Sequence, residues 1–322
     1  MAFFKHTQPV GTTSGDDTPK PTLPAGPETK DGLRDFWQHW DYLMGLVNEL
    51  DEFGVDVLDA VGLTLNEAIL AEVDLGTDIK AGDVLIEKGT KVRPQMVGLL
   101  TGMGIRRVMA RPNPRVLVIA LSEAAMPASF MVAAEVQAAG AQTHRMEFVF
   151  SSATQVVTSI IEQLVRSDLV VTVGGLGEAG LDLRAVADQI GPSSFTPVAI
   201  NPGSDHGFAL AEERTPLLAL PAEVYPAFVL TKLLVEPMIS KLMGAGTDPI
   251  LFSAHLAQPL RVAPGRLTCV PATVTDARMT ITGRPTGLEG LNTIYRANAL
   301  AILSSPTGLL DRGSEAFYLP LG

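Results

Sequence analysis

The sequence predicts an α/β protein whose central part is a parallel sheet with helices on both faces. Between residues 114 and 245, continuous apolar runs alternate with amphipathic stretches, which is the pattern of repeated β-α-β units. After residue 246 the chain is rich in Val, Thr, Pro and Gly and has no long helical stripe. We therefore predict a tail (1–30), a helical and β-hairpin segment (31–111), a parallel-sheet α/β domain (112–246) and a β-rich C-terminal domain (247–322).

The first thirty residues are predicted to be a disordered tail. Residues 7–30 contain five prolines and few large apolar side chains, so they cannot bury enough surface to offset the entropy of ordering. The six residues before them, MAFFKH, are aromatic and basic. They are either a frayed end or an apolar anchor on a tether that docks into a partner.

Short elements follow the tail. Apolar residues at three- and four-residue spacing predict a helix over 33–47, and a second amphipathic stretch predicts a helix over 55–73. Glycine-punctuated apolar runs over 79–92 indicate small β-hairpins. A proline in the first turn indicates a further short helix over 94–102.

The α/β domain is predicted from strands and helices that alternate along the chain. Apolar runs predict strands over 115–121, 144–150, 168–175, 195–203 and 216–220. Amphipathic stretches predict helices over 129–141, 152–167, 180–191 and 224–244. Ligands of parallel sheets bind at the carboxyl ends of the strands, so the loops of interest are 122–128, 174–182 and 201–208.

The C-terminal domain is predicted to consist of short strands, with one brief helix and a following strand within 290–303. Cys269, the only cysteine, lies in a strand-like run and is expected to be a buried structural thiol. A single cysteine excludes an intrachain disulfide and a cysteine-built metal site.

Charge and hydropathy narrow the function classes. The chain has 24 Lys and Arg against 35 Asp and Glu, a net charge of −11, which disfavours binding to nucleic acid or an anionic membrane surface. No run reaches the roughly 18 apolar residues of a membrane helix. We expect a cytoplasmic protein that binds no nucleic acid and does not insert into a membrane.

The order of these segments is similar to that of the MoeA/gephyrin family of molybdopterin molybdotransferases. Four collinear stretches carry the resemblance, over 58–75, 79–120, 167–183 and 287–321. The resemblance implies a molybdopterin-binding α/β domain, a small β C-terminal domain and a homodimer. It also implies two uses of the fold, transfer of molybdate and the clustering of protein partners, since gephyrin clusters partners.

The first two binding loops of the family are altered in this chain. Where the family has Thr-Gly-Asp-Glu after a strand, only Ser122 and Glu123 are available here. In the turn that the family writes Gly-Gly-Val-Ser-x-Gly-x-x-Asp, the serine is replaced by Gly177, and Glu178 adds a carboxylate. This chain keeps three positions of the family's turn, Gly174, Gly175 and Asp182.

The remaining family motifs are altered or missing. The Pro-Gly-Lys-Pro loop loses its lysine here and reads Pro202, Gly203, Ser204 and Asp205. The Leu-Pro-Gly-Asn-Pro turn has Ala222 and Glu223 at its centre. A domain on the order of a hundred residues, which carries the family's Ser-Ala-Met-Asp-Gly-Tyr-Ala motif, is absent before residue 79.

These changes turn a site for anions into an acidic one. Molybdopterin and molybdate are anions, which need backbone N–H groups, a helix N-terminus, or Lys and Arg. The loops instead carry five carboxylates and no lysine or arginine: Glu123, Glu178, Asp182, Asp205 and Glu223. We expect no catalytic residue, with Asp182 as a remnant, and molybdopterin or Mg²⁺ only if the family activity is retained.

Several of these residues also have a purely structural interpretation. Asp182 suits the positive end of a helix dipole, and the glycine pair suits a tight strand-to-helix turn. Ser204, Asp205 and His206 resemble a nucleophile–acid–base set, although adjacent residues cannot easily align in that order. Asp205 and His206 together with Glu178 are alternatively a metal site or solvated loop residues.

Three functions therefore remain open: a non-catalytic scaffold that binds a protein partner, an active molybdotransferase with an unusual site, and a pterin-binding carrier. We favour the scaffold. The partner is expected in a groove between the α/β and C-terminal domains. The homodimer is expected to form through the N-terminal helices, with the apolar stripe of the 33–47 helix, and through the parallel-sheet domain. The groove rim is predicted from five apolar residues, which alternatively form the core of the small domain: Phe252, Leu256, Leu288, Tyr295 and Phe317.

Overall fold

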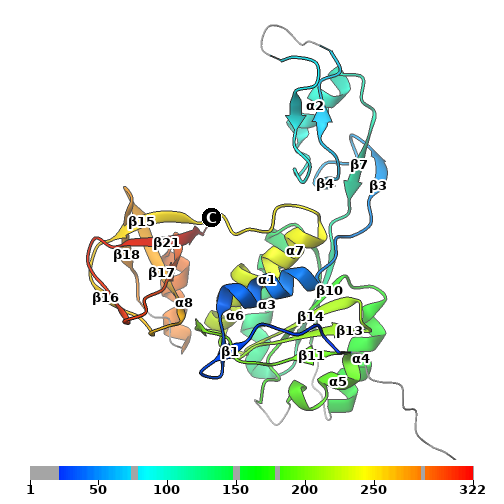
Figure 1. Cartoon of the computed structure of the whole chain (residues 1–322). Coiled ribbons are helices and arrows are strands. Elements are labelled where there is room, and N and C mark those ends of the chain that lie inside the picture. The colour runs from blue at the N-terminus through cyan, green and yellow to red at the C-terminus, as the bar shows by residue number, and fades with distance from the viewer. Residues whose placement is uncertain (1–21, 74–78, 148–152, 178–181, 284–286, 322) are drawn as a thin grey trace, which may run out of the picture.

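A computed structural model describes residues 22–73, 79–147, 153–177, 182–283 and 287–321. The chain forms three parts, which we call the lobe (51–111), the central domain (22–50 and 112–246) and the barrel domain (247–321). The lobe projects away from the other two parts (Figure 1). The predicted segment 31–111 is thus divided, because its first helix packs on the central domain.

The lobe is built from small sheets and one helix. Strands β3 (Phe53–Asp56) and β4 (Thr64–Leu65) both pair antiparallel with β7 (Arg107–Arg111). Strands β5 (Ile69–Leu70) and β6 (Val84–Ile86) form a ribbon, and helix α2 (Pro94–Gly102) begins at the proline predicted to open it.

The helix predicted over 55–73 is wrong. This stretch forms the strands β3, β4 and β5 with turns between them. Its buried side chains, Val57, Ala60, Leu65 and Ile69, happen to recur at intervals close to a helical repeat. Pairing with β7, some forty residues later, overrides that local pattern.

The central domain contains one six-stranded sheet. Its order is β11 (Ser193–Ser194), β13 (Gly207–Ala211), β14 (Thr215–Leu220), β10 (Leu169–Val173), β8 (Arg115–Ala120) and β9 (Gln142–Glu147). The last four strands are parallel, and β13 and β11 are antiparallel to their neighbours. The predicted parallel sheet is therefore present, with an antiparallel edge that includes the unpredicted strand β13.

Helices cover both faces of this sheet, as predicted. One face carries α1 (Phe36–Leu46), α3 (Met126–Ala138), and a long helix composed of α6 (Val224–Leu230), the π-helical turn η4 (Thr231–Val235) and α7 (Glu236–Leu242). The other face carries α4 (Ala153–Leu164) and the short α5 (Ala187–Ile190). The helix predicted over 180–191 is mostly replaced by the 3₁₀ turn η3 (Leu183–Ala185) and α5.

The N-terminal helix is buried within the chain. Asp35 caps α1 by accepting hydrogen bonds from the backbone N–H groups of Trp37 and Gln38. The apolar stripe of α1, which we expected at a dimer interface, instead packs in the largest core cluster. Its buried members are Phe36, Trp40, Leu43 and Met44. The helix begins at Phe36 because Leu33 belongs to a short strand, β2 (Leu33–Arg34).

The described end of the predicted tail is attached to the central domain. In place of disorder, residues 22–30 contain β1 (Thr29–Lys30), which pairs with β2. Leu23 packs against the core, and the carbonyl of Pro24 accepts a hydrogen bond from the Tyr42 hydroxyl at 2.9 Å. Residues 1–21, including most of the predicted tail, lie outside the described residues.

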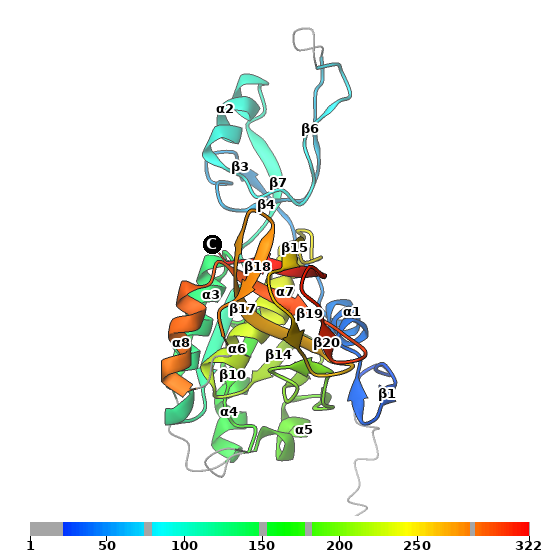
Figure 2. The ribbon, with the colours of Figure 1, turned by 90° about the vertical axis from the view of Figure 1, so that its left-hand side faces the viewer.

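The C-terminal part is a small closed barrel with one helix, α8 (Gly287–Arg296), beside it (Figure 2). The barrel strands are β17 (Leu267–Thr275), β18 (Arg278–Ile281), β15 (Phe252–Leu256), β21 (Glu315–Pro320) and β19 (Ala299–Leu303). Pairing of β19 with β17 closes the ring, and Cys269 on β17 is buried as predicted. A separate short pair joins β16 (Leu260–Arg261) and β20 (Leu309–Leu310).

The barrel is fixed to the central domain. Strand β12 (Ile200–Asn201), from the third loop of interest, pairs with β17, and the Tyr225 hydroxyl donates to the Cys269 carbonyl at 2.6 Å. Side chains on the outer face of β17 and β19 join the core cluster of the central domain. The third loop is therefore held between two domains.

Candidate functional site

The candidate site lies where β8, β10 and β14 end. Ser122 follows β8, and its Oγ accepts a hydrogen bond from the Ala125 backbone N–H at 3.2 Å, which caps a 3₁₀ turn. Glu123 is exposed at the start of that turn, and Glu223 is exposed at the start of α6. Neither carboxylate has a described partner.

The glycine pair after β10 is explained by close packing of protein atoms. Gly174 and Gly175 have φ angles of 82° and 75°, which favour glycine. A Cβ at Gly174 would lie 3.0 Å from the Cβ of Ala125 and 3.1 Å from the Oγ of Ser122. A Cβ at Gly175 would lie 2.7 Å from a methyl carbon of Leu121. The turn thus approaches the loop after β8.

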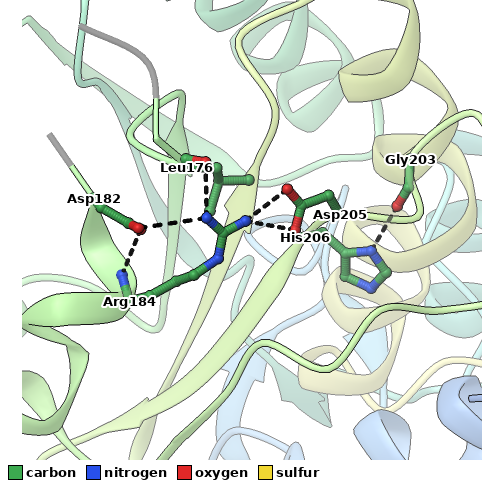
Figure 3. Close-up of polar contacts among 6 residues, drawn as sticks. All are labelled: Leu176, Asp182, Arg184, Gly203, Asp205 and His206. Atoms are coloured by element: carbon green, nitrogen blue, oxygen red, sulfur yellow. Dashed lines mark hydrogen bonds and ion pairs between the residues drawn. The ribbon is translucent and has the colours of Figure 1, made fainter. Parts of the chain in front are cut away.

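Asp182 and Asp205 meet at Arg184, which lies two residues beyond the end of the second loop of interest (Figure 3). Both carboxylate oxygens of Asp205 lie 2.6 Å from Arg184 Nη2, and Asp182 Oδ2 lies 3.5 Å from Nη1. Nη1 also donates to the Leu176 carbonyl at 2.9 Å. The hydrogen bond to Asp205 raises the pKa of Arg184, so the guanidinium is firmly charged.

Asp182 also has the structural role that was expected of it. Its Oδ1 accepts a hydrogen bond from the Arg184 backbone N–H at 3.1 Å and caps η3. Arg184 thereby joins the loop after β10 to the loop that contains Asp205. This ion pair is partly exposed, and its side chains are 33% and 57% accessible, so its contribution to stability is modest.

A second arginine at this edge of the sheet is also engaged. Arg145 on β9 forms an ion pair with Glu147, and its Nη1 donates to the Ser129 Oγ at 3.0 Å. Its guanidinium carbon lies 3.6 Å from the ring centre of Phe130, a cation–π contact. Arg145 and Arg184 therefore each have a carboxylate partner.

The third loop does not form a catalytic set. The Ser204 Oγ donates to the Val198 carbonyl at 2.6 Å, which holds the turn after Pro202 and Gly203. Asp205 faces Arg184, whereas His206 is buried on the other side of the loop (Figure 3). Ser204, Asp205 and His206 therefore point to three different environments.

His206 instead forms a buried pair with His39 of α1. Its Nδ1 lies 2.7 Å from the Gly203 carbonyl, which only accepts, so Nδ1 carries the proton. The two Nε2 atoms are 3.1 Å apart, so His39 Nε2–H donates to His206 Nε2. The Nδ1 of His39 has no hydrogen-bond partner in the described part of the chain. Burial lowers the pKa of both imidazoles, that of His39 to about 3.

The residues do not fit a metal site. Among the described residues, no group of three or more His, Cys, Asp or Glu could hold a metal ion. Asp205 and His206 diverge, and Glu178, the third expected ligand, lies outside the described residues.

The five predicted rim residues are not brought together. Leu256 is buried in the barrel core, and the side chain of Leu288 on α8 lies outside the described residues. Tyr295 is exposed on α8, and Phe252 is half exposed beside Tyr318 at a ring distance of 5.9 Å. Phe317 alone lines a groove between the two domains, opposite Trp37 of α1.

Sequence reasoning missed Arg184 and His39, although each had a signal. Arg184 follows Asp182 by two residues, at the end of the second loop of interest. His39 is the one polar residue at a buried position of the α1 stripe. Neither signal shows the partner, because Asp205 and His206 come from a distant part of the chain.

Among the described residues, no helix is both long and apolar enough to cross a membrane. No family model matches the chain. Molybdopterin molybdenumtransferase 1 of Mycobacterium tuberculosis is 30% identical over 208 residues, which cover 59% of this chain and 49% of that protein. The molybdopterin molybdenumtransferase of Haemophilus influenzae is 28% identical over 209 residues, or 60% and 52% of the two chains. This chain spans about half the length of the curated relatives it matches.

Solved structures share the fold. A molybdenum cofactor biosynthesis protein from Pyrococcus furiosus superposes with a TM-score of 0.73 and 22% identity, covering 90% of this chain and 100% of that one. The molybdopterin biosynthesis moeA protein of Pyrococcus horikoshii gives a TM-score of 0.72 and 15% identity over the same shares. At these identities the likeness establishes the fold.

Proposed function

Because this chain belongs to the MoeA-type family of molybdenum cofactor biosynthesis proteins, we propose that it is a non-catalytic member that acts as a dimeric scaffold for a protein partner. The observation that carries the proposal is Arg184, which is held between Asp182 and Asp205. A cytoplasmic location is part of the same proposal.

The chemistry of the loops supports the loss of catalysis. Transfer of molybdate to molybdopterin requires the site to hold two anions, and each needs uncompensated positive charge or free N–H donors. The guanidinium of Arg184 is already neutralised by Asp205, and Glu123 and Glu223 add exposed negative charge. Like charges in one cleft oppose the binding of an anion.

The partner surface is proposed from two domains that the structure describes, the central domain with its six-stranded sheet and the barrel domain. The groove between these domains, which Phe317 and Trp37 line, is the proposed partner surface.

Genetic rescue tests the absence of catalysis. A cell that lacks its own molybdenumtransferase should gain no molybdoenzyme activity from this chain, whereas the Mycobacterium tuberculosis relative serves as the positive control. Rescue by this chain would show that it is an active transferase and would end the scaffold proposal.

Calorimetry with molybdate tests the role of Asp205. We expect no binding heat from the wild type. Asp205→Asn removes the negative charge but keeps the size of the side chain, and should allow weak binding at Arg184. Glu162→Gln, on the exposed side of α4, is the matched control and should behave as wild type. Wild-type binding as tight as that of Asp205→Asn would contradict the neutralisation argument.

A second candidate is a pterin-binding carrier that performs no transfer. Arg184 favours it, because one third of its side chain is exposed and an anionic phosphate has access to it by displacing Asp205. The carrier predicts that the wild type binds molybdopterin saturably, that Arg184→Gln loses this binding, and that the chain still gives no genetic rescue. These three results together would favour the carrier over the scaffold.

A further inference from the structure

The groove between α1 and the barrel domain is an apolar cavity of about 420 Å³. Trp37 of α1 forms one wall, and residues of the barrel and the segment before it form the others. Most of the lining is apolar, and Glu315 is its single charged side chain. The main apolar lining residues of the barrel side are Leu251, Leu267, Ile302, Leu310 and Phe317. A cavity of this size accommodates one or two aromatic side chains.

The chain itself contains a segment of matching chemistry. Among residues 1–21, the only aromatic side chains are Phe3 and Phe4, and Lys5 and His6 follow them directly. The next fifteen residues are mostly Thr, Gly, Ser, Asp and Pro. Two phenyl rings suit the apolar walls, and the Lys5 ammonium suits the carboxylate of Glu315.

The attachment point of this segment lies on the helix that forms the groove. The chain reaches α1 where the Pro24 carbonyl accepts the hydrogen bond from Tyr42. Seventeen residues separate His6 from Pro24, and a polar chain of that length has a root-mean-square span of roughly 23 Å. Helix α1 has 11 residues and is therefore about 16 Å long. The segment can thus reach Trp37 from an anchor at Tyr42.

We propose that residues 1–6 of this chain bind in the groove between α1 and the barrel domain, with the phenyl rings of Phe3 and Phe4 between Trp37 and Phe317. The short tether gives the segment an effective concentration in the millimolar range, so weak intrinsic affinity is sufficient. A protein partner of the groove would have to displace the segment. The inference concerns the resting occupant of the groove, so its failure leaves the proposed scaffold role standing.

Two variants of the barrel give a matched comparison. Phe317 on β21 and Phe252 on β15 are each 49% exposed. Phe317 is opposite Ser253 and Phe252 is opposite Tyr318 on the paired strands, so the two rings project from opposite faces of the sheet. Phe317→Ser alters the groove and Phe252→Ser does not, although each exchanges the same half-exposed ring.

The experiment uses the full chain with a nitroxide at Ala2→Cys, since the native Cys269 is buried. We expect the label to broaden the indole N–H resonance of Trp37 at protein concentrations where dilution has no effect. Broadening should fall at least fivefold in Phe317→Ser and in the double variant Phe3→Ser/Phe4→Ser, and persist in Phe252→Ser. A Trp37→Phe variant assigns the resonance.

A peptide titration provides the second measurement. The peptide MAFFKHTQ should shift the Trp37 emission of a chain lacking residues 1–21 to shorter wavelength and saturate, whereas MASSKHTQ should not. Equal effects of Phe317→Ser and Phe252→Ser, or no broadening of Trp37 in the full chain, would overturn the proposal. Broadening that disappears on dilution would overturn it too, because the segment would then bind a second copy.

Discussion

At the scale of single residues, the buried histidine pair is the feature with the most direct consequence. His39 and His206 come from α1 and the third loop, and burial keeps both imidazoles neutral when folded. The folded pKa of His39, about 3, lies below its unfolded value near 6.5. Below pH 6.5 the unfolded chain therefore takes up a proton that the folded chain does not.

This difference predicts a loss of stability in mild acid. His39 alone should lower the free energy of unfolding by about 1.4 kcal/mol for each pH unit between about pH 6 and 4, and contribute no pH dependence above pH 7. Urea unfolding at several pH values should give a shallower dependence for His39→Gln than for wild type. His144→Gln, an exposed control on β9, should keep the wild-type slope. Equal slopes for all three proteins would refute the role of burial.

The glycine turn predicts a packing effect at one residue. An alanine at position 174 meets Ala125 and Ser122 in addition to its unfavourable φ, whereas Gly313 has a φ of 85° and open space around it. Gly174→Ala should therefore lower the free energy of unfolding by about 2–4 kcal/mol, and Gly313→Ala by about 1 kcal/mol. Chemical denaturation measures both. Equal losses would mean that backbone strain alone explains the glycine.

At the scale of elements, the described end of the tail has a testable role. Residues 22–30 pack Leu23 on the core and form the β1–β2 hairpin. A chain lacking residues 1–30 should therefore melt several degrees below a chain lacking residues 1–21, as followed by circular dichroism. Identical melting temperatures would restore the view that residues 22–30 contribute nothing to the fold.

The sequence predicted correctly those elements whose ends or burial are marked by their own residues. Helix α2 begins at Pro94 and ends at Gly102 as predicted, since proline suits the first turn of a helix. Strands β8 and β10 are apolar apart from Arg115 and Thr172, because both faces of the sheet are covered. The helix predicted over 55–73 was wrong because the strand that pairs with this stretch, β7, is remote in sequence.

In the candidate site, too, the sequence predicted local features but not the pairing of distant residues. The loops, the glycine pair and Asp182 follow from strand ends and turn chemistry. The pairing of Arg184 with Asp205 and of His39 with His206 depends on how distant segments meet. The charge counted along the loops therefore missed Arg184, which lies just beyond the second loop and pairs with Asp182 and Asp205.

At the scale of the whole molecule, the lobe carries half of the large apolar side chains that are exposed in the described part of the chain. They include Leu58, Val61, Leu70, Val73, Val84 and Leu99. Exposed apolar side chains are candidates for an interface, and the α1 stripe is not available for one because it is buried. We therefore expect the homodimer to form through the lobe.

Light scattering at micromolar concentration should give twice the 34.1 kDa mass of the chain for wild type. The double variant Leu58→Asp/Val61→Asp should give the monomer mass. Val165→Asp, at a more exposed site at the end of α4, is the control and should remain dimeric. A wild-type monomer, or dissociation by the control alone, would exclude the lobe as the interface.

The way the lobe joins the rest of the chain has a further consequence. Its first and last strands, β3 and β7, are hydrogen-bonded neighbours, with Phe53 opposite Ala110. The lobe has its own core, separate from those of the other parts. Because the chain enters and leaves the lobe on neighbouring strands, recombination can exchange the lobe as a unit without interrupting the central sheet. Transplanted between relatives, the lobe would carry its surface to a new host and leave the fold of that host intact.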